Sequence, residues 1–246
     1  MRNLKFTMSY DGTNYHGFQI QKEDITIEKA LKDAVFKLTE EDVDIIGCGR
    51  TDAGVHAINY TFNFKTSSTI PCDKFPIAFS TVLPSDISVT SCEEASKDFH
   101  SRFSALKKTY KYVIYTGKLN NPFYNRYSHH IKHPLDLENM KKAAKLIEGE
   151  KDFKCFMAQG SPVNDTVRTV YGIEIEKKDD IIEIEVTGNG FLYNMVRIIA
   201  GTLVAVGGGK ISPSEIENII DSKKRENAGM TLPPQGLFLK EVFYGK

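Results

Sequence analysis

The amino-acid sequence predicts an α+β protein made of two halves, residues 1–105 and 106–246, each of which mixes strands with helices. Three observations favour this class. Short segments alternate apolar and polar residues at the period of a strand, while others repeat apolar residues at helical spacing. The order of strand, loop and helix begins afresh after residue 105, although no repeat of individual residues relates the halves. A chain of 246 residues that is 41% hydrophobic suits one large domain or two closely joined ones.

The first half is predicted to combine strands with two helices. The strands are expected over residues 4–10, 43–48, 57–65 and 86–92, and the helices over 26–40 and 72–81. Thr26 can cap the longer helix, because apolar residues recur after it at helical spacing. The segment GCGRTDAGVHA then connects two strands, which is a place where catalytic groups are often mounted.

The second half is predicted to begin with a strand over residues 109–116, followed by a loop rich in basic and aromatic residues. A helix over 136–148, a hairpin over 166–188 with KKDD at its turn, a helix over 193–206 and a last strand within 233–244 follow. Another helix begins at SPSE, where Ser212 is the cap and Glu215 completes a capping box.

Charge is distributed unevenly along the chain, although the net charge is zero. Residues 100–146 contain ten Lys or Arg and only two acids, a surplus of eight that the rest of the chain balances. A segment of this kind favours a surface that binds a polyanion such as a nucleic acid. A solvated helix face accounts for only three of these cations, which are Lys141, Lys142 and Lys145.

Composition and spacing argue against several other classes of protein. The N-terminal residues do not resemble a signal peptide, and no apolar run is long enough to span a bilayer. Four cysteines without C-x-x-C spacing indicate reduced thiols and a cytoplasmic protein. The glycine patterns do not match a dinucleotide or phosphate loop, and H-H-x-x-H at 129–133 lacks an acidic partner. We therefore expect no cofactor and no metal.

Asp52 and Arg197 are unusual in their surroundings. Arg197 lies in an apolar segment expected to form a mostly buried helix, where a guanidinium needs a carboxylate or several acceptors. An arginine nearby would lower the pKa of a buried Asp52 and keep it ionised, as a nucleophile requires. The sequence thus predicts that the two residues pair. The alternatives are an Asx-turn at Asp52 and an Arg197 side chain that reaches the surface.

Aromatic residues alternate with cations between residues 100 and 130. In the strand TYKYVIYT, Tyr110 and Tyr112 share one face and Lys111 lies on the other. Tyrosines beside cations suit stacking on unpaired RNA bases. Most of these aromatic residues are expected to belong to the core of a second sheet, and Tyr110 is the candidate for a functional role.

A set of motifs spans nearly the whole chain. It comprises YDGTNYHGFQ, GCGRTDAGVHA, LPSDI, DFHSRFSALKKTYKY, DF at 152–153, VRT at 167–169, GNGFLYNMVRIIAGTLVAVG and TLPPQGLFL. In content and order the set closely resembles the TruA family of tRNA pseudouridine synthases. The resemblance implies a pseudouridine synthase fold, in which two α+β halves with antiparallel sheets meet at a central catalytic cleft.

The resemblance also implies roles for individual residues. Asp52 matches the catalytic aspartate, which forms a covalent adduct or triggers elimination at the sugar. Arg50 matches an arginine that helps to extrude the target base, and Tyr110 matches the tyrosine that packs on the flipped uridine. Arg197 matches the basic residue paired with the aspartate. Arg50 and Tyr110 thereby also bind substrate, and RNA contacts are expected from further cations, which are Lys107, Lys108, Lys111 and Arg126.

The implied reaction isomerises uridine to pseudouridine in the anticodon stem-loop of tRNA, at positions 38, 39 and 40, without a cofactor. Because the target base lies in a stem, it must be flipped out of the stack. The resemblance further implies a homodimer with RNA crossing both subunits. Two alternatives remain, namely a synthase that acts on other RNA sites and an RNA-binding relative without catalytic activity.

Overall fold

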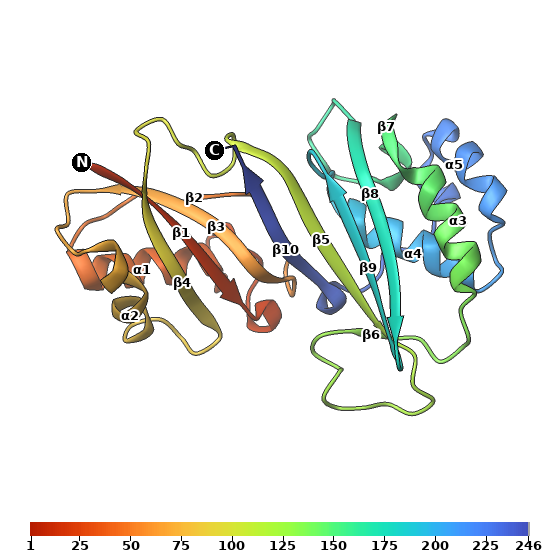
Figure 1. Cartoon of the computed structure of the whole chain (residues 1–246), viewed down its shortest axis with the longest axis horizontal. Helices are drawn as coiled ribbons and strands as arrows, with labels where there is room; N and C mark the ends of the chain where they lie inside the picture. Colours follow the sequence, from red (N-terminus) through yellow and green to blue (C-terminus); the bar gives the residue numbers. More distant parts are fainter. Residues whose placement is uncertain (246) are drawn as a thin grey trace. The chain divides into compact units, whose positions relative to one another are not determined.

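The computed structural model describes residues 1–245, and within them the chain divides into two compact units (Figure 1). The first contains Met1–Leu106 together with the end of the chain from Phe238 onward, and the second is Lys107–Leu237. Each unit mixes helices with mostly antiparallel strands, which confirms the predicted α+β class. Among the described helices, none is long and apolar enough to cross a membrane, and no disulfide joins the described cysteines.

In the first unit the strands are ordered β4-β1-β3-β10. These strands are β1 (Arg2–Tyr10), β3 (His56–Thr66), β4 (Ile87–Ala95) and β10 (Leu237–Tyr244), and the short β2 (Ile46–Gly47) pairs with β3. β1 is antiparallel to both β3 and β4, while β10 runs parallel to β3. The helices are α1 (Ile27–Thr39) and α2 (Phe75–Ser80), and 3₁₀ turns cover Gly12–Asn14 and Cys72–Lys74.

A cluster of phenylalanines forms the core of the first unit. The Phe6 ring of β1 stacks on Phe62 and Phe64 of β3, with centroids 4.9 Å away in both cases. Phe75 and Phe79 of α2 meet the Phe6 ring edge-on at 5.4 and 5.6 Å. All five side chains are fully buried, so this cluster fixes α2 against β1 and β3.

In the second unit the strands are ordered β5-β9-β8-β7, all antiparallel. They are β5 (Ala105–Tyr115), β7 (Gly149–Asp152), β8 (Val167–Lys178) and β9 (Ile181–Gly188), and the short β6 (His129–His130) runs parallel to β5. The helices are α3 (Leu137–Ile147), α4 (Met195–Gly207) and α5 (Ile216–Ser222). Short 3₁₀ turns cover Lys154–Phe156, Pro213–Glu215, Arg225–Asn227 and Pro234–Gly236.

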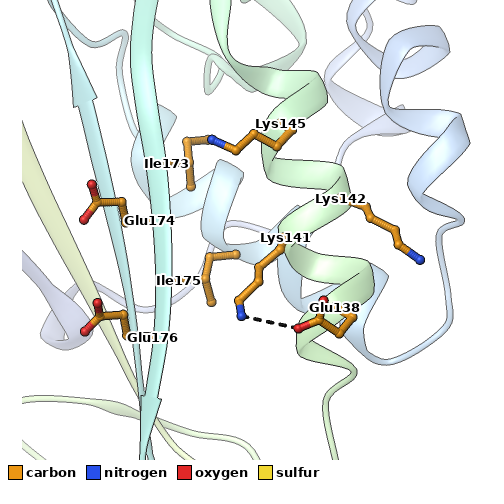
Figure 2. A pocket seen from close by; sticks show the side chains of 8 residues that line it. All are labelled: Glu138, Lys141, Lys142, Lys145, Ile173, Glu174, Ile175 and Glu176. Atoms are coloured by element: carbon orange, nitrogen blue, oxygen red, sulfur yellow. Dashed lines mark hydrogen bonds and ion pairs between the residues drawn. The ribbon is translucent and has the colours of Figure 1, made fainter.

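The strand β8 illustrates how alternation builds the core of the second unit. Ile173 and Ile175 point toward α3, whereas Glu174 and Glu176 point to the opposite side of the strand (Figure 2). The two isoleucines are buried and the two glutamates are exposed. The period-two pattern in the sequence therefore corresponds to one face packed against helices and one face in solvent.

Several predicted boundaries differ from the structure. The last strand, expected in a second half of residues 106–246, belongs to the first unit, because Phe238 and Leu239 pair with His56 and Ala57 of β3. Only Ile46–Gly47 of the segment expected over 43–48 forms a strand, and β6 and β7 were not predicted. Helix α4 begins at Met195 because Asn194 has the left-handed φ of 60°.

Candidate active site

The loop that carries Asp52 joins β2 to β3 in the first unit. Asp52 is half-buried and its carbonyl oxygen accepts the N–H of Val55 at 3.2 Å, which closes a turn over residues 52–55. Gly54 occupies that turn with a φ of 75°, a conformation that favours glycine. Arg50, two residues earlier, is exposed. The loop therefore presents one carboxylate at the border of the protein interior and one guanidinium in solvent.

Residues 10–18 clamp this loop from one side. The Tyr10 and Thr51 hydroxyls, both buried, form a hydrogen bond of 2.8 Å. The Phe18 N–H donates to the Thr51 carbonyl at 3.1 Å, and the Gly54 N–H donates to the Tyr15 carbonyl at 3.2 Å. The residues on both sides of Asp52 are thus held by hydrogen bonds from a segment more than thirty positions earlier in the chain.

Gly17 allows this close approach. Its φ is 84°, and a Cβ at this position would lie 2.5 Å from the Thr51 carbonyl oxygen and 3.3 Å from the Asp52 carbonyl carbon. Any side chain would push the clamp away from the Asp52 loop. The motif YDGTNYHGFQ therefore has a structural role in supporting the second motif, GCGRTDAGVHA.

His56 is a buried residue of the site that the sequence did not single out. Its side chain is 1% exposed, and its Nδ1 lies 3.0 Å from the Gly12 N and 3.1 Å from Asp11 Oδ1. Nδ1 accepts from Gly12 only without a proton and bonds Asp11 only with one, so the two contacts are alternatives. Both join the start of β3 to the clamp. A lone histidine in an alternating strand gives no sequence signal for such a contact.

Tyr60 supports the loop at its other end. Its hydroxyl donates to the Gly49 carbonyl at 2.5 Å, and its ring stacks on Phe18 with centroids 4.6 Å apart. Since Gly49 precedes Arg50, the backbone on both sides of the Arg50–Asp52 segment is anchored. The carboxylate is thus preorganised by contacts to its neighbours in the chain.

Tyr110 lies in β5 of the second unit, opposite Val186 of β9. It is half-buried, and its ring meets Phe191 edge-on with centroids 5.2 Å apart and an interplanar angle of 84°. Gly188 accommodates Phe191, because a Cβ there would lie 3.1 Å from the Phe191 ring and 2.9 Å from the Thr169 carbonyl oxygen. Phe191 is a second residue that the sequence did not identify as part of the site.

Tyr112, two residues further on, is a core residue. It is fully buried and its hydroxyl donates to the Pro233 carbonyl at 2.7 Å. Burial raises the pKa of Tyr112, and the charge of Arg197 opposes that rise. Arg197 therefore lies near the Tyr112 ring within the second unit.

Arg197 lies in the first turns of α4 and is half-buried. Its Nε donates to the Leu232 carbonyl at 2.7 Å, and one terminal nitrogen donates to Asn194 Oδ1 at 2.6 Å. Acceptors therefore meet the guanidinium, as its position in an apolar helix requires. Asp52 belongs to the other unit, so the pairing of Asp52 with Arg197 stays a prediction.

The predicted RNA-contact residues differ in their surroundings. Lys107 and Arg126 are exposed and Lys108 is half-buried. Lys111 forms an ion pair of 2.8 Å with Glu183, so its charge is already balanced by an acid of β9.

The histidines of the H-H-x-x-H motif make contacts that are typical of a structural role. His130 Nε2 lies 2.7 Å from the Gly117 carbonyl oxygen, and burial and the neighbouring His130 lower the pKa of His129. Within residues 1–245, no group of three His, Cys, Asp or Glu side chains is arranged to hold a metal ion.

Comparison with known proteins identifies relatives over nearly the whole chain. A family model described as tRNA pseudouridine synthase matches residues 7–104 and 143–245. The tRNA pseudouridine synthase A of Thermoanaerobacter sp. (strain X514) is 50% identical over 244 residues, which cover 99% of this chain and 100% of the relative. The tRNA pseudouridine synthase A of Caldicellulosiruptor saccharolyticus is 48% identical over 244 residues, which cover 99% of this chain and 100% of that relative. A solved Cbf5-Nop10-Gar1 complex contains a chain with a TM-score of 0.39 and 13% identity, over 82% of this chain and 45% of that one.

Proposed function

The chain belongs to the tRNA pseudouridine synthase family, and we propose that it isomerises uridine to pseudouridine in tRNA with Asp52 as the catalytic residue. The reaction breaks the bond between N1 of uracil and C1′ of the ribose. The base then turns over and C5 bonds to C1′, while the proton on C5 is lost and N1 gains one. No atom is added or removed and no electron is transferred to a partner, so the proposed reaction needs no cofactor.

The observation that carries the assignment is the way in which Asp52 is held. Its neighbours Thr51 and Gly54 are both bonded to residues 10–18, while its own carboxylate lies at the border of the interior. A nucleophile or a base gains most from such preorganisation, because a displacement of about 1 Å costs on the order of a hundredfold in rate. An Asx-turn alone would not require hydrogen bonds from residues 10–18 to the chain both before and after Asp52.

Three further residues are proposed to assist Asp52. The exposed Arg50 extrudes the target base, and Tyr110 packs on the flipped uracil from a ring position fixed by Phe191. Arg197 is held by two acceptors and keeps its positive charge. We propose that this charge stabilises the ionised Asp52 carboxylate. For the contacts to RNA phosphates we propose Lys107, Lys108, Lys111 and Arg126.

The proposed substrate site is the anticodon stem-loop, with uridines 38, 39 and 40 as targets. We further propose a cytoplasmic homodimer, on both of whose subunits the tRNA rests. A synthase acting on other RNA sites would share the same catalytic residues, so the substrate must be tested separately from the chemistry.

Tritium release from tRNA labelled at C5 of uracil tests the proposed function. Wild-type protein is expected to release tritium from transcripts with uridine at positions 38–40 and not from transcripts with cytidine at all three. Tritium release from both kinds of transcript would show that the target uridine lies elsewhere in the tRNA. Release from neither transcript would refute the substrate assignment. Asp52→Ala is expected to release none while it still binds the transcript, and release at the wild-type rate would refute the role of Asp52.

A further inference from the structure

We propose that the loop between β5 and β6, residues 117–128, is a second contact surface for the tRNA. In this surface Phe123 stacks on an unpaired base, and Lys118 and Arg126 meet phosphates. The inference rests on the proposed function, since it takes tRNA as the substrate, and it adds a binding element remote in sequence from Asp52.

The β5–β6 loop exposes large apolar side chains to an unusual degree. Phe123 is 86% exposed and Leu119 is 80% exposed, while Tyr124 and Tyr127 are 38% and 41% exposed. Single exposed apolar residues are common on protein surfaces, but a group of them within nine residues is typical of an interaction site. The group therefore indicates that something covers this loop.

The β5–β6 loop is nevertheless ordered by its own contacts. The Tyr124 ring stacks on Tyr115 of β5 with centroids 4.8 Å apart, and the Tyr124 carbonyl accepts the Ser128 hydroxyl at 2.8 Å. The Phe123 N–H donates to Asn121 Oδ1 at 3.1 Å. Tyr124 thus anchors the loop, and the adjacent Phe123 is held in solvent. A ring presented on a fixed backbone loses little conformational entropy when it binds.

The charge of the same segment favours a nucleic acid. Between Gly117 and His133 the sequence contains no Asp or Glu, while Lys118, Arg126 and Lys132 are all exposed. The β8–β9 turn lies beside the start of the loop, where the Thr116 N–H donates to the Asp180 carbonyl at 2.7 Å. That turn has two lysines and two aspartates at 177–180, so its own net charge is zero. Cations next to exposed rings are the combination that binds single-stranded nucleotides.

The basic face of α3 makes a useful contrast in the same unit. Lys141 pairs with Glu138 at 3.3 Å, and Lys145 pairs with Glu148 at 2.9 Å (Figure 2). A groove of about 440 Å³ lies between α3 and β8, but it is lined by glutamates as well as lysines. The α3 face therefore has neither the excess positive charge nor the exposed rings of the β5–β6 loop.

A second copy of the chain fits the β5–β6 loop less well than RNA does. If two such loops met across a two-fold axis, each would place Lys118 and Arg126 against the same cations of its copy. Like charges in an interface are unfavourable, and charged residues are depleted from the cores of protein interfaces. The phosphates of RNA supply the opposite charge.

Filter binding of an unmodified tRNA transcript tests the surface directly. Phe123→Ala is expected to raise the Kd by about fivefold or more, because stacking on one base is lost. Phe123→Trp is expected to retain binding, since it keeps a ring. The matched control is Phe36→Ala, which removes a 55% exposed phenylalanine from α1 and should leave the Kd unchanged. Lys118→Ala should reduce the slope of log Kd against log salt by about 0.7.

Two results would overturn the inference. One is a Kd for Phe123→Ala within twofold of the wild-type value. The other is an unchanged Kd together with a halved mass of Phe123→Ala in sedimentation, which would make the β5–β6 loop a contact between copies of the chain. Because the Kd is measured without turnover, a wild-type protein that binds tRNA but forms no pseudouridine would refute the proposed function and leave this inference intact.

Discussion

The two units hold their candidate functional residues in different ways. In the first unit, Asp52 lies in a loop, and backbone and hydroxyl groups of residues 10–18 hold its neighbours Thr51 and Gly54. In the second unit, Tyr110 and Arg197 lie on a strand and a helix, where the Tyr110 ring contacts Phe191 and the Arg197 guanidinium donates to Leu232 and Asn194. The loop residue therefore depends on a close fit of two backbone segments, whereas the residues on regular elements depend on contacts of their own side chains.

Gly17→Ala should have the largest effect, because it separates the two backbone segments. The left-handed φ costs about 1–2 kcal/mol for alanine, and the contact with the Thr51 carbonyl adds about 1–3 kcal/mol. A shift of Thr51 by about 1 Å should lower kcat on the order of a hundredfold. Chemical denaturation and turnover assays measure the two effects.

Gly209→Ala is the matched control for Gly17→Ala. Gly209 has a φ of 74°, but no atom lies within 4 Å of the place that a Cβ would occupy there. The stability of the variant should fall only by the cost of the left-handed backbone conformation, and its kcat should not change. Equal kcat values for the two variants would contradict the role of the clamp.

The predicted pair of Asp52 and Arg197 can be tested as a coupling between the units. Arg197→Met should lower the free energy of unfolding by about 1–3 kcal/mol, because the Leu232 carbonyl loses a donor. If the pair forms in a buried place, the loss should reach about 3–5 kcal/mol. A double-mutant cycle with Asp52→Asn separates the loss of the Leu232 contact from the loss of the ion pair. A coupling energy near zero between Arg197 and Asp52 would refute the pair.

Tyr10→Phe tests the hydroxyl contact within the clamp. The Thr51 hydroxyl loses a buried partner, so stability should fall by about 1–3 kcal/mol and kcat should fall with it. Thr202→Val is the control, because its buried hydroxyl donates to the Ile198 carbonyl at 2.9 Å and accepts the Gly229 N–H at 2.8 Å, all within the second unit. A similar loss of stability in both variants, with a lower kcat only for Tyr10→Phe, is the expected result. An unchanged kcat for Tyr10→Phe would confine the contact to a role in stability.

Phe191→Leu, in the second unit, should have the smallest effect on kcat. The edge-on contact with Tyr110 contributes about 0.5–1.5 kcal/mol, so the Tyr110 ring should lose its preferred orientation while the fold persists. We expect kcat to fall several-fold, and Phe191→Tyr to restore it because the ring is retained. Steady-state kinetics at saturating tRNA measure the change, and wild-type kinetics for Phe191→Leu would remove Phe191 from the positioning of Tyr110.

The local sequence predicted the elements that depend on local patterns. Helix α1 extends over Ile27–Thr39 against a prediction of 26–40, and the Thr26 hydroxyl accepts the Lys29 N–H as a cap should. The apolar run at 43–48 correctly predicted burial of Val43 and Ile45, but burial does not specify strand pairing. The assignment of β10 to the first unit depends on its pairing with β3, nearly two hundred residues away, which no local pattern encodes.

The candidate site was predictable to the extent that single residues are unusual. Asp52 between glycines and Arg197 in an apolar helix are visible in the sequence. The contacts of Tyr10 with Thr51 and of His56 with Gly12 are not, because they join positions about forty residues apart through the pairing of β1 with β3. Phe191 was missed because an aromatic residue at the start of an apolar run is expected to be a core residue.

Single-turnover formation of pseudouridine, with enzyme in excess over tRNA, is the decisive test of Asp52 as the catalytic residue. Under these conditions the rate reports the chemistry of the bound substrate, and the Kd is measured separately for wild-type protein and Asp52→Asn. We expect Asp52→Asn to bind tRNA with the wild-type Kd and to form no pseudouridine. Formation of pseudouridine by Asp52→Asn at the wild-type rate would refute the catalytic role of Asp52.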